Sequence, residues 1–158
     1  MLGTHDYLVL KSLHILGVVL FLGNIIVTAF WKILADLSND GKIISFSQRL
    51  VTYTDIIFTG TGVILIAVTG AVMAQSYGSY WDVKWLFWGI SLFAASGLIW
   101  VIVLIPVQII LYRIAQSMKN ESIVPARYWA YERIWSIFGV IATLLPLVNL
   151  YWMVFKPN

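Results

Sequence analysis

Four apolar stretches, each long enough to cross a bilayer, dominate this sequence. They cover residues 8–34, 53–74, 85–106 and 134–155, and a hydrocarbon core of roughly 30 Å requires about 20 apolar residues in a helix. Because the membrane interior offers backbone groups no water, each stretch must satisfy its own hydrogen bonds as a helix. The sequence therefore predicts an all-α fold, a transmembrane four-helix bundle, as a single domain over residues 1–158. The first stretch is too long for a signal peptide, so we expect it to be retained.

Composition excludes several classes of protein. Hydrophobic residues make up 61% of the chain and charged residues 11%, whereas about 25% of an ordinary soluble domain is charged. The absence of cysteine excludes a thiolate metal site and a cysteine nucleophile. A net charge of +3 is too small and too scattered for a nucleic-acid surface, so no nucleic-acid partner is expected. No nucleotide-binding loop, serine triad or zinc spacing is present, and whether the protein is an enzyme is left open.

The basic residues predict how the chain lies in the membrane. Seven of the ten fall in or beside the connections that follow spans one and three, namely Lys32, Lys42, Arg49, Arg113, Lys119, Arg127 and Arg133. Lys11, Lys84 and Lys156 fall on the other side. The positive-inside bias therefore predicts a multi-pass membrane protein with both connections in the cytoplasm and both termini outside it.

Each span carries one stripe of small or polar residues that should face the other helices. The stripes are His14, Gly17, Phe21, Asn24 and Thr28 on span one; Asp55, Thr59, Gly62, Ile66, Thr69 and Met73 on span two; Lys84, Trp88, Ser91, Ala95 and Leu98 on span three; and Ala142, Pro146 and Asn149 on span four. Asp55 lies near the cytoplasmic end, where we expect it to pair with Arg49 or with an arginine of the second connection.

Four residues near the outer side form the candidate site. His14 is the one histidine inside a span, roughly 10 Å from its outer boundary, and Asn149 lies at a similar depth. An imidazole at this depth either ligates a metal, here the iron of haem b, or forms a hydrogen bond with a neighbour such as Asn149. Lys84 is either an interfacial lysine or, with Lys11, a partner of haem propionates. We expect His14, Lys84 and Asn149 to share a polar pocket.

Two functions of different classes follow from these residues. In the first, the protein is a haem-binding bundle with a redox or porphyrin-related role. In the second, it is a non-catalytic accessory or scaffold subunit of a larger membrane complex, and self-association into a homo-oligomer is also left open. A transporter or channel is a third hypothesis with less support, because no ring of charged residues is apparent along the spans.

Short motifs along nearly the whole chain resemble a bacterial family of four-span membrane proteins of unknown function. The motifs are LKSLHILG at 10–17, AFWK at 29–32, WLFW at 85–88, GLIW at 97–100, PVQ at 106–108 and MVFKP at 153–157. More distantly, the LKxLH start, the entries to spans two and three and the closing Lys156-Pro157 are similar to HemJ-type protoporphyrinogen oxidases and CopD-like membrane proteins. The resemblance implies the bacterial inner membrane as the location.

In HemJ-type enzymes a helix-one histidine and a helix-three lysine support a b-type haem, and the matching positions here are His14 and Lys84. The chain departs from the HemJ pattern at the entry to its last span, residues 131–136, and lacks a second histidine near span three.

Overall fold

The computed structural model describes residues 3–79 and 81–157, and it is built from helices joined by short connections. In chain order the elements are α1 (Thr4–Leu37), α2 (Gly41–Thr54), the π-helical turn η1 (Asp55–Thr59), α3 (Gly60–Ala74), the 3-10 turn η2 (Gln75–Tyr77), α4 (Lys84–Ile99), the π-helical turn η3 (Trp100–Leu104), α5 (Ile105–Ser117) and α6 (Ala126–Phe155).

The turns η1, η2 and η3 join their neighbours without a break, so the chain forms four continuous rods. These rods are Thr4–Leu37, Gly41–Tyr77, Lys84–Ser117 and Ala126–Phe155, and each is long and apolar enough to cross a membrane. No strand occurs in the described part of the chain. The all-α transmembrane bundle predicted from the sequence is thereby confirmed.

The rods extend beyond the predicted spans because their ends are amphipathic. The second rod begins at Gly41, where the Asp40 side chain caps the helix by accepting a hydrogen bond from the Lys42 backbone N–H at 2.8 Å. The third continues past Pro106 to Ser117. Only residues 38–40 separate the first two rods, and Asn39 takes a positive φ of 48° there.

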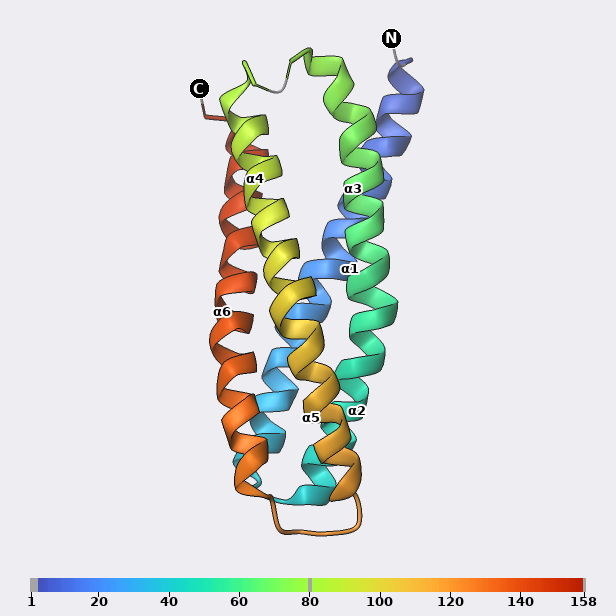
Figure 1. The fold of residues 1–158 in the computed structure, drawn as a ribbon. Helices are drawn as coiled ribbons and strands as arrows, with labels where there is room; N and C mark the ends of the chain where they lie inside the picture. The colour runs from blue at the N-terminus through green and yellow to red at the C-terminus, as the bar shows by residue number, and fades with distance from the viewer. Residues whose placement is uncertain (1–2, 80, 158) are drawn as a thin grey trace.

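The rods run alternately up and down (Figure 1). Both chain ends and the connection between α3 and α4 lie together at one end, called the termini end; the connections α1–α2 and α5–α6 lie at the other, called the loop end. α1 packs mainly on α3, α4 packs mainly on α6, and α2 contacts both α1 and α5. α1 crosses from beside α3 at the termini end toward α6 at the loop end.

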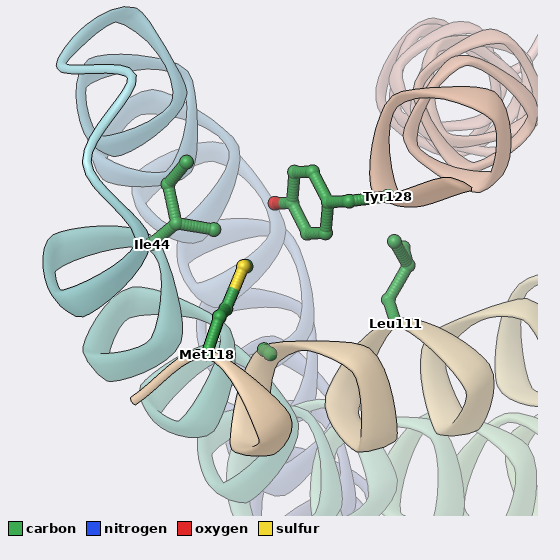
Figure 2. Packing of buried hydrophobic residues seen from close by; sticks show 5 residues of the cluster. Ile44, Leu111, Met118 and Tyr128 are labelled. Carbon is green, nitrogen blue, oxygen red and sulfur yellow. The ribbon is translucent and has the colours of Figure 1, made fainter. Parts of the chain in front are cut away.

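The best-packed apolar cluster sits at the loop end, where α2, α5 and α6 converge (Figure 2). It consists of Ile44, Leu111, Ala115, Met118 and Tyr128. Along the rest of the bundle many large apolar side chains point outward, among them Phe30, Ile56 and Ile102, each at least 66% exposed. Such a surface suits lipid rather than water, so the protein lies in a bilayer.

Burial agrees with the predicted stripes on the first, second and fourth rods. Their innermost members are buried, namely Gly17, Phe21 and Thr28; Thr59, Gly62 and Thr69; and Ala142 and Pro146. The predicted stripe on the third rod is wrong.

On the third rod Lys84, Trp88 and Leu98 are exposed, whereas Gly89 and Ser96 are buried. Lys84 opens α4, where water and headgroups reach it, so its charge turns outward instead of marking the inner face. The inner face is marked by Ser96, whose hydroxyl donates to the Ala142 carbonyl of α6 at 2.8 Å.

Candidate functional site

A cavity of about 680 Å³ lies between α1, η1, the third rod and α6. Most of its wall is apolar or aromatic, including Phe21, Trp100, Trp129 and Trp135. The charged side chains in its lining are those of Lys32, Asp36, Asp55 and Glu132. A cavity of this size, with apolar walls and a few converging polar groups, is typical of a small-molecule site.

Both π-helical turns contribute to this cavity. η1 supplies Asp55 and Thr59, and η3 supplies Trp100 and Leu104. A π-helical turn inserts an extra residue into a helix, so it shifts the side chains that follow, and such turns are frequent at functional sites. The second turn has a local cause: Pro106 has no N–H to donate to the preceding turn, and its ring crowds that turn.

Lys32 is the centre of an ion cluster at the loop end of the cavity. Its ammonium lies 2.6 Å from Glu132 Oε2 and 3.3 Å from Asp36 Oδ2, and it donates to Tyr128 Oη at 2.8 Å. Tyr128 donates its own hydroxyl proton to Asp36 Oδ1 at 2.7 Å. The Ser136 hydroxyl donates to Glu132 Oε1 at 2.9 Å. These contacts join α1 to α6 through polar groups alone.

The cluster sets two acidic side chains against one ammonium inside the protein. The Lys32 side chain is 2% exposed, and the Asp36 and Glu132 side chains are 15% and 9% exposed. The ammonium also lies 5.2 Å and 5.4 Å from the centres of the Tyr128 and Trp135 rings, which adds cation–π attraction. The ammonium donates to Asp36 Oδ2 and to Tyr128 Oη, and its ion pair with Glu132 adds a second balancing charge.

A second polar group lies deeper in the cavity, around Asp55. Asp55 Oδ1 accepts from Asn24 Nδ2 at 3.0 Å and from the Thr59 hydroxyl at 3.1 Å, and Asn24 Nδ2 also contacts Thr59 Oγ1 at 2.9 Å. The expected pairing of Asp55 with Arg49 or with an arginine of the second connection is wrong: its hydrogen bonds go to Asn24 and Thr59, and Arg49 lies over the Phe46 ring at 5.7 Å. The groups that hydrogen-bond Asp55 are therefore neutral, and no cation is among them.

The Lys32 cluster is not predicted from the sequence, because the sequence pattern assigns Lys32 to a connection as one of its charges and Asp36 to that same connection. α1 in fact continues to Leu37, so both residues are helical. One signal could have revealed them: Lys32 and Asp36 are four residues apart, as are Tyr128 and Glu132. Each pair therefore occupies one helix face, which is how a cluster between two helices is built.

His14 lies between α1 and α3, away from its expected neighbour. Its Nδ1 is 2.9 Å from Thr69 Oγ1, and the Thr69 hydroxyl proton is directed to the Leu65 carbonyl at 2.5 Å. Thr69 therefore accepts from His14, which assigns the proton of a neutral ring to Nδ1 and leaves a lone pair on Nε2. The expected hydrogen bond from His14 to Asn149 is wrong, because Thr69 faces α1 at this level and takes its place.

The other predicted site residues are dispersed at the termini end. Lys11 and Lys84 are both exposed. Asn149 belongs to the α4–α6 interface, where its Oδ1 is buried without a hydrogen-bond partner and lies beside Gly89. The lysine that meets aromatic rings at this end is Lys156, 4.8 Å from the centre of the Trp85 ring. No group of three or more histidine, aspartate or glutamate side chains within the described residues could hold a metal ion.

The sequence of residues 8–157 matches the profile of DUF2269, a family described as a predicted integral membrane protein. The chain belongs to this family. DUF2269 is defined as a membrane family without a stated activity, in agreement with the four rods and with the membrane family that the motifs resemble. No curated protein and no solved structure matches the chain, so the more distant similarity to HemJ-type and CopD-like proteins receives no support from these comparisons.

Proposed function

We propose that this DUF2269 protein binds a small amphipathic molecule in the cavity between α1 and α6. The observation that carries the proposal is the composition of the cavity: about 680 Å³ with apolar and aromatic walls, and charged groups gathered around Lys32 and Asp55. An amphipathic molecule would place its apolar body against the tryptophans and its polar end at one of these groups.

The cavity is open to the lipid-facing side of the bundle. Four of its lining residues, Ile33, Leu37, Val140 and Leu144, are each more than half exposed. They come from α1 and α6, which contact each other at few places. Since these side chains face lipid, the route into the cavity runs from the bilayer, where an amphipathic molecule is already concentrated.

Filling the cavity tests this proposal. Gly139 lines the cavity, and a Cβ atom there would meet nothing within 4 Å, so Gly139→Leu should fill the cavity without disturbing the helices. Gly97 is equally open but is not among the lining residues, and Gly97→Leu is the matched control.

The probes share one apolar body and differ in the end group: para-bromophenylbutanol, para-bromophenylbutylamine and para-bromophenylbutanoate. Bromine quenches nearby tryptophan fluorescence, and three tryptophans line the cavity. We expect saturable quenching by at least one probe in the natural protein and in Gly97→Leu, and its loss in Gly139→Leu. Binding by no probe, or equal binding by all three proteins, would refute the proposal.

A second candidate is a haem b held by His14, and the observation that favours it is the Nδ1–H contact with Thr69. Axial histidines donate Nδ1–H to an acceptor while Nε2 binds iron, and His14 fits the first half of this arrangement. Lys11 and Lys84, exposed toward the same end, would neutralise propionates. When bound, haem would supply electron-transfer chemistry.

The absorption spectrum of the purified protein tests whether it binds haem. Protein purified from haem-replete cells should show a Soret band that His14→Ala removes while the protein still inserts into the membrane. Lys84→Met should weaken haem binding less, because a contact near water is screened. No Soret band in the natural protein would exclude haem.

A further inference from the structure

We infer that the ligand of the α1–α6 cavity carries a positive charge and that its binding releases a proton from the cavity to water. This inference rests on the proposed function, and it adds the chemical class of the ligand and an ion exchange that accompanies binding. Three observations support it: the donors of the cavity, its charge balance and its aromatic walls.

The ammonium and the hydroxyl groups that line the cavity are already engaged within the protein. Lys32 donates to Tyr128 and Asp36 and forms an ion pair with Glu132. The same holds for the hydroxyls of the cavity: Thr28, Thr59, Ser96, Ser136 and Thr143 donate to protein oxygens. What remains is acceptor capacity on the carboxylates, because a carboxylate oxygen can accept more than one hydrogen bond. These acceptors favour a ligand that brings donors.

The charge balance selects a cation over a neutral donor. Asp36 on α1, Asp55 on η1 and Glu132 on α6 face the cavity with Lys32 as the one ammonium, and Tyr128 is a neutral hydroxyl donor. The third rod lines the cavity with Ser96, Trp100, Leu104 and Gln108, none of which carries a charge. An anion would meet three acidic side chains and one ammonium that is already ion-paired with Asp36 and Glu132, so the charge balance disfavours an anionic ligand.

The aromatic wall suits the same kind of ligand. The Lys32 ammonium already lies 5.4 Å from the Trp135 ring centre, which shows that this wall accommodates a cation. Trp100 and Trp129 offer further rings around the same space. Indole faces attract cations more strongly than other aromatic side chains do, so a protonated amine on an apolar body matches both the charge and the walls.

The expected release of a proton follows from the cost of burying uncompensated charge. Three carboxylates with one ammonium would leave two uncompensated negative charges inside the protein, which is costly without partners. In the absence of ligand a carboxyl group of the cavity therefore holds a proton. When the ammonium of the ligand arrives, this carboxylic acid becomes a carboxylate and its proton leaves to the aqueous buffer. No covalent bond to the ligand forms, and the net charge of the cavity is unchanged.

Calorimetry on the full protein in lipid nanodiscs tests both parts, using the three probes defined above. We expect the amine to bind about tenfold or more tightly than the alcohol, because hydrogen bonds between charged groups exceed neutral ones by that much, and the butanoate not to bind. Titrations in phosphate and in Tris at one pH should differ in heat by the release of about one proton per amine, since the two buffers take up protons with different enthalpies.

Two variants locate the exchange. Glu132→Gln should lower the affinity for the amine about tenfold and reduce the proton release. Glu121→Gln, an exposed residue in the connection before α6, should change neither. If Glu132→Gln does not fold, Asp36→Asn replaces it. The comparison of the three probes in the natural protein still tests whether the ligand is a cation.

The outcomes separate this inference from the proposal on which it rests. Equal or tighter binding of the alcohol or the butanoate would overturn the inference and leave the cavity as a binding site. Amine binding with the same heat in both buffers would overturn the proton exchange. Binding by none of the three probes would refute the proposed function itself.

Discussion

At the scale of single residues, Lys32 shows what a charge inside a membrane bundle requires. A buried ammonium is tolerated only when its donors are satisfied and its charge is balanced. Here α1 supplies one carboxylate and α6 supplies another, together with the Tyr128 hydroxyl. The lysine thus holds together two helices that otherwise touch at few places.

Replacing Lys32 by methionine should therefore destabilise the protein strongly. Removing one partner of a buried ion pair costs about 3–5 kcal/mol, because the remaining charge is left uncompensated. We expect a lower melting temperature in detergent for Lys32→Met and partial recovery in the double variant Lys32→Met/Glu132→Gln. Lys42→Met, an exposed lysine, should change the stability by less than about 0.5 kcal/mol. Equal effects of the two single variants would contradict this account.

The hydrogen bond between His14 and Thr69 is the second residue-scale test. Thr69→Val keeps the shape of the side chain but leaves the Nδ1–H of His14 without its acceptor, which should cost about 1–3 kcal/mol. Thr143→Val is the matched control, because the Thr143 hydroxyl bonds only to a carbonyl of its own helix. Thermal unfolding of both variants should show the larger loss for Thr69→Val; an equal loss would mean that the contact with His14 adds nothing.

At the scale of elements, α1 and α3 approach so closely that only glycine fits between them. A Cβ atom on Gly62 would lie 2.8 Å from the Gly17 carbonyl oxygen and 2.8 Å from the Phe21 backbone nitrogen. Backbone atoms inside a helix cannot move away singly, so the two helices would have to separate. Small residues at such crossings are how helices pack in lipid, where apolar side chains gain nothing by leaving the bilayer.

Gly62→Ala should therefore weaken the α1–α3 pair. Overpacking a tight contact costs about 1–3 kcal/mol, and we expect a correspondingly lower melting temperature. Gly23→Ala provides the control, because a Cβ atom at that position of α1 meets nothing within 4 Å; alanine should be neutral or stabilising there, by up to about 1 kcal/mol from helix propensity. A loss of stability in Gly23→Ala as large as in Gly62→Ala would contradict the packing argument.

At the scale of the whole molecule, both termini share one end of the bundle (Figure 1), which leaves two orientations in the membrane. Lys32 no longer counts as a charge of the connections, because it is buried. The exposed basic residues at the loop end are still the majority, namely Lys42, Arg49, Arg113, Lys119, Arg127 and Arg133. Lys11, Lys84 and Lys156 lie at the termini end, so the charge bias again favours a cytoplasmic loop end.

Reporter fusions test this orientation. Alkaline phosphatase, which is active only outside the cytoplasm, should be active when fused after Asn158 and inactive when inserted near Asn39. A fluorescent protein that matures in the cytoplasm should give the opposite pattern. Reversed labelling by both reporters would overturn the orientation while leaving the helix bundle unaffected.

The sequence by itself determined the number of helices, their alternating directions and the inner stripes of three rods. Each of these depends on local properties: the length of an apolar stretch compared with the bilayer and the 100° rotation per residue. The stripes that contain Gly17, Thr59 and Ala142 could be placed because small or polar residues in lipid must face protein.

Only the tertiary structure decided which stripes meet, and this depends on helix tilt and local winding. α1 crosses the bundle from α3 toward α6, which brings Lys32 to Glu132 and pairs His14 with Thr69 rather than with Asn149. The same packing brings Asp55 of η1 and Trp100 of η3 to one cavity with Lys32 and Glu132. Helix tilt arises from packing between whole helices, and no local pattern in the chain specifies it.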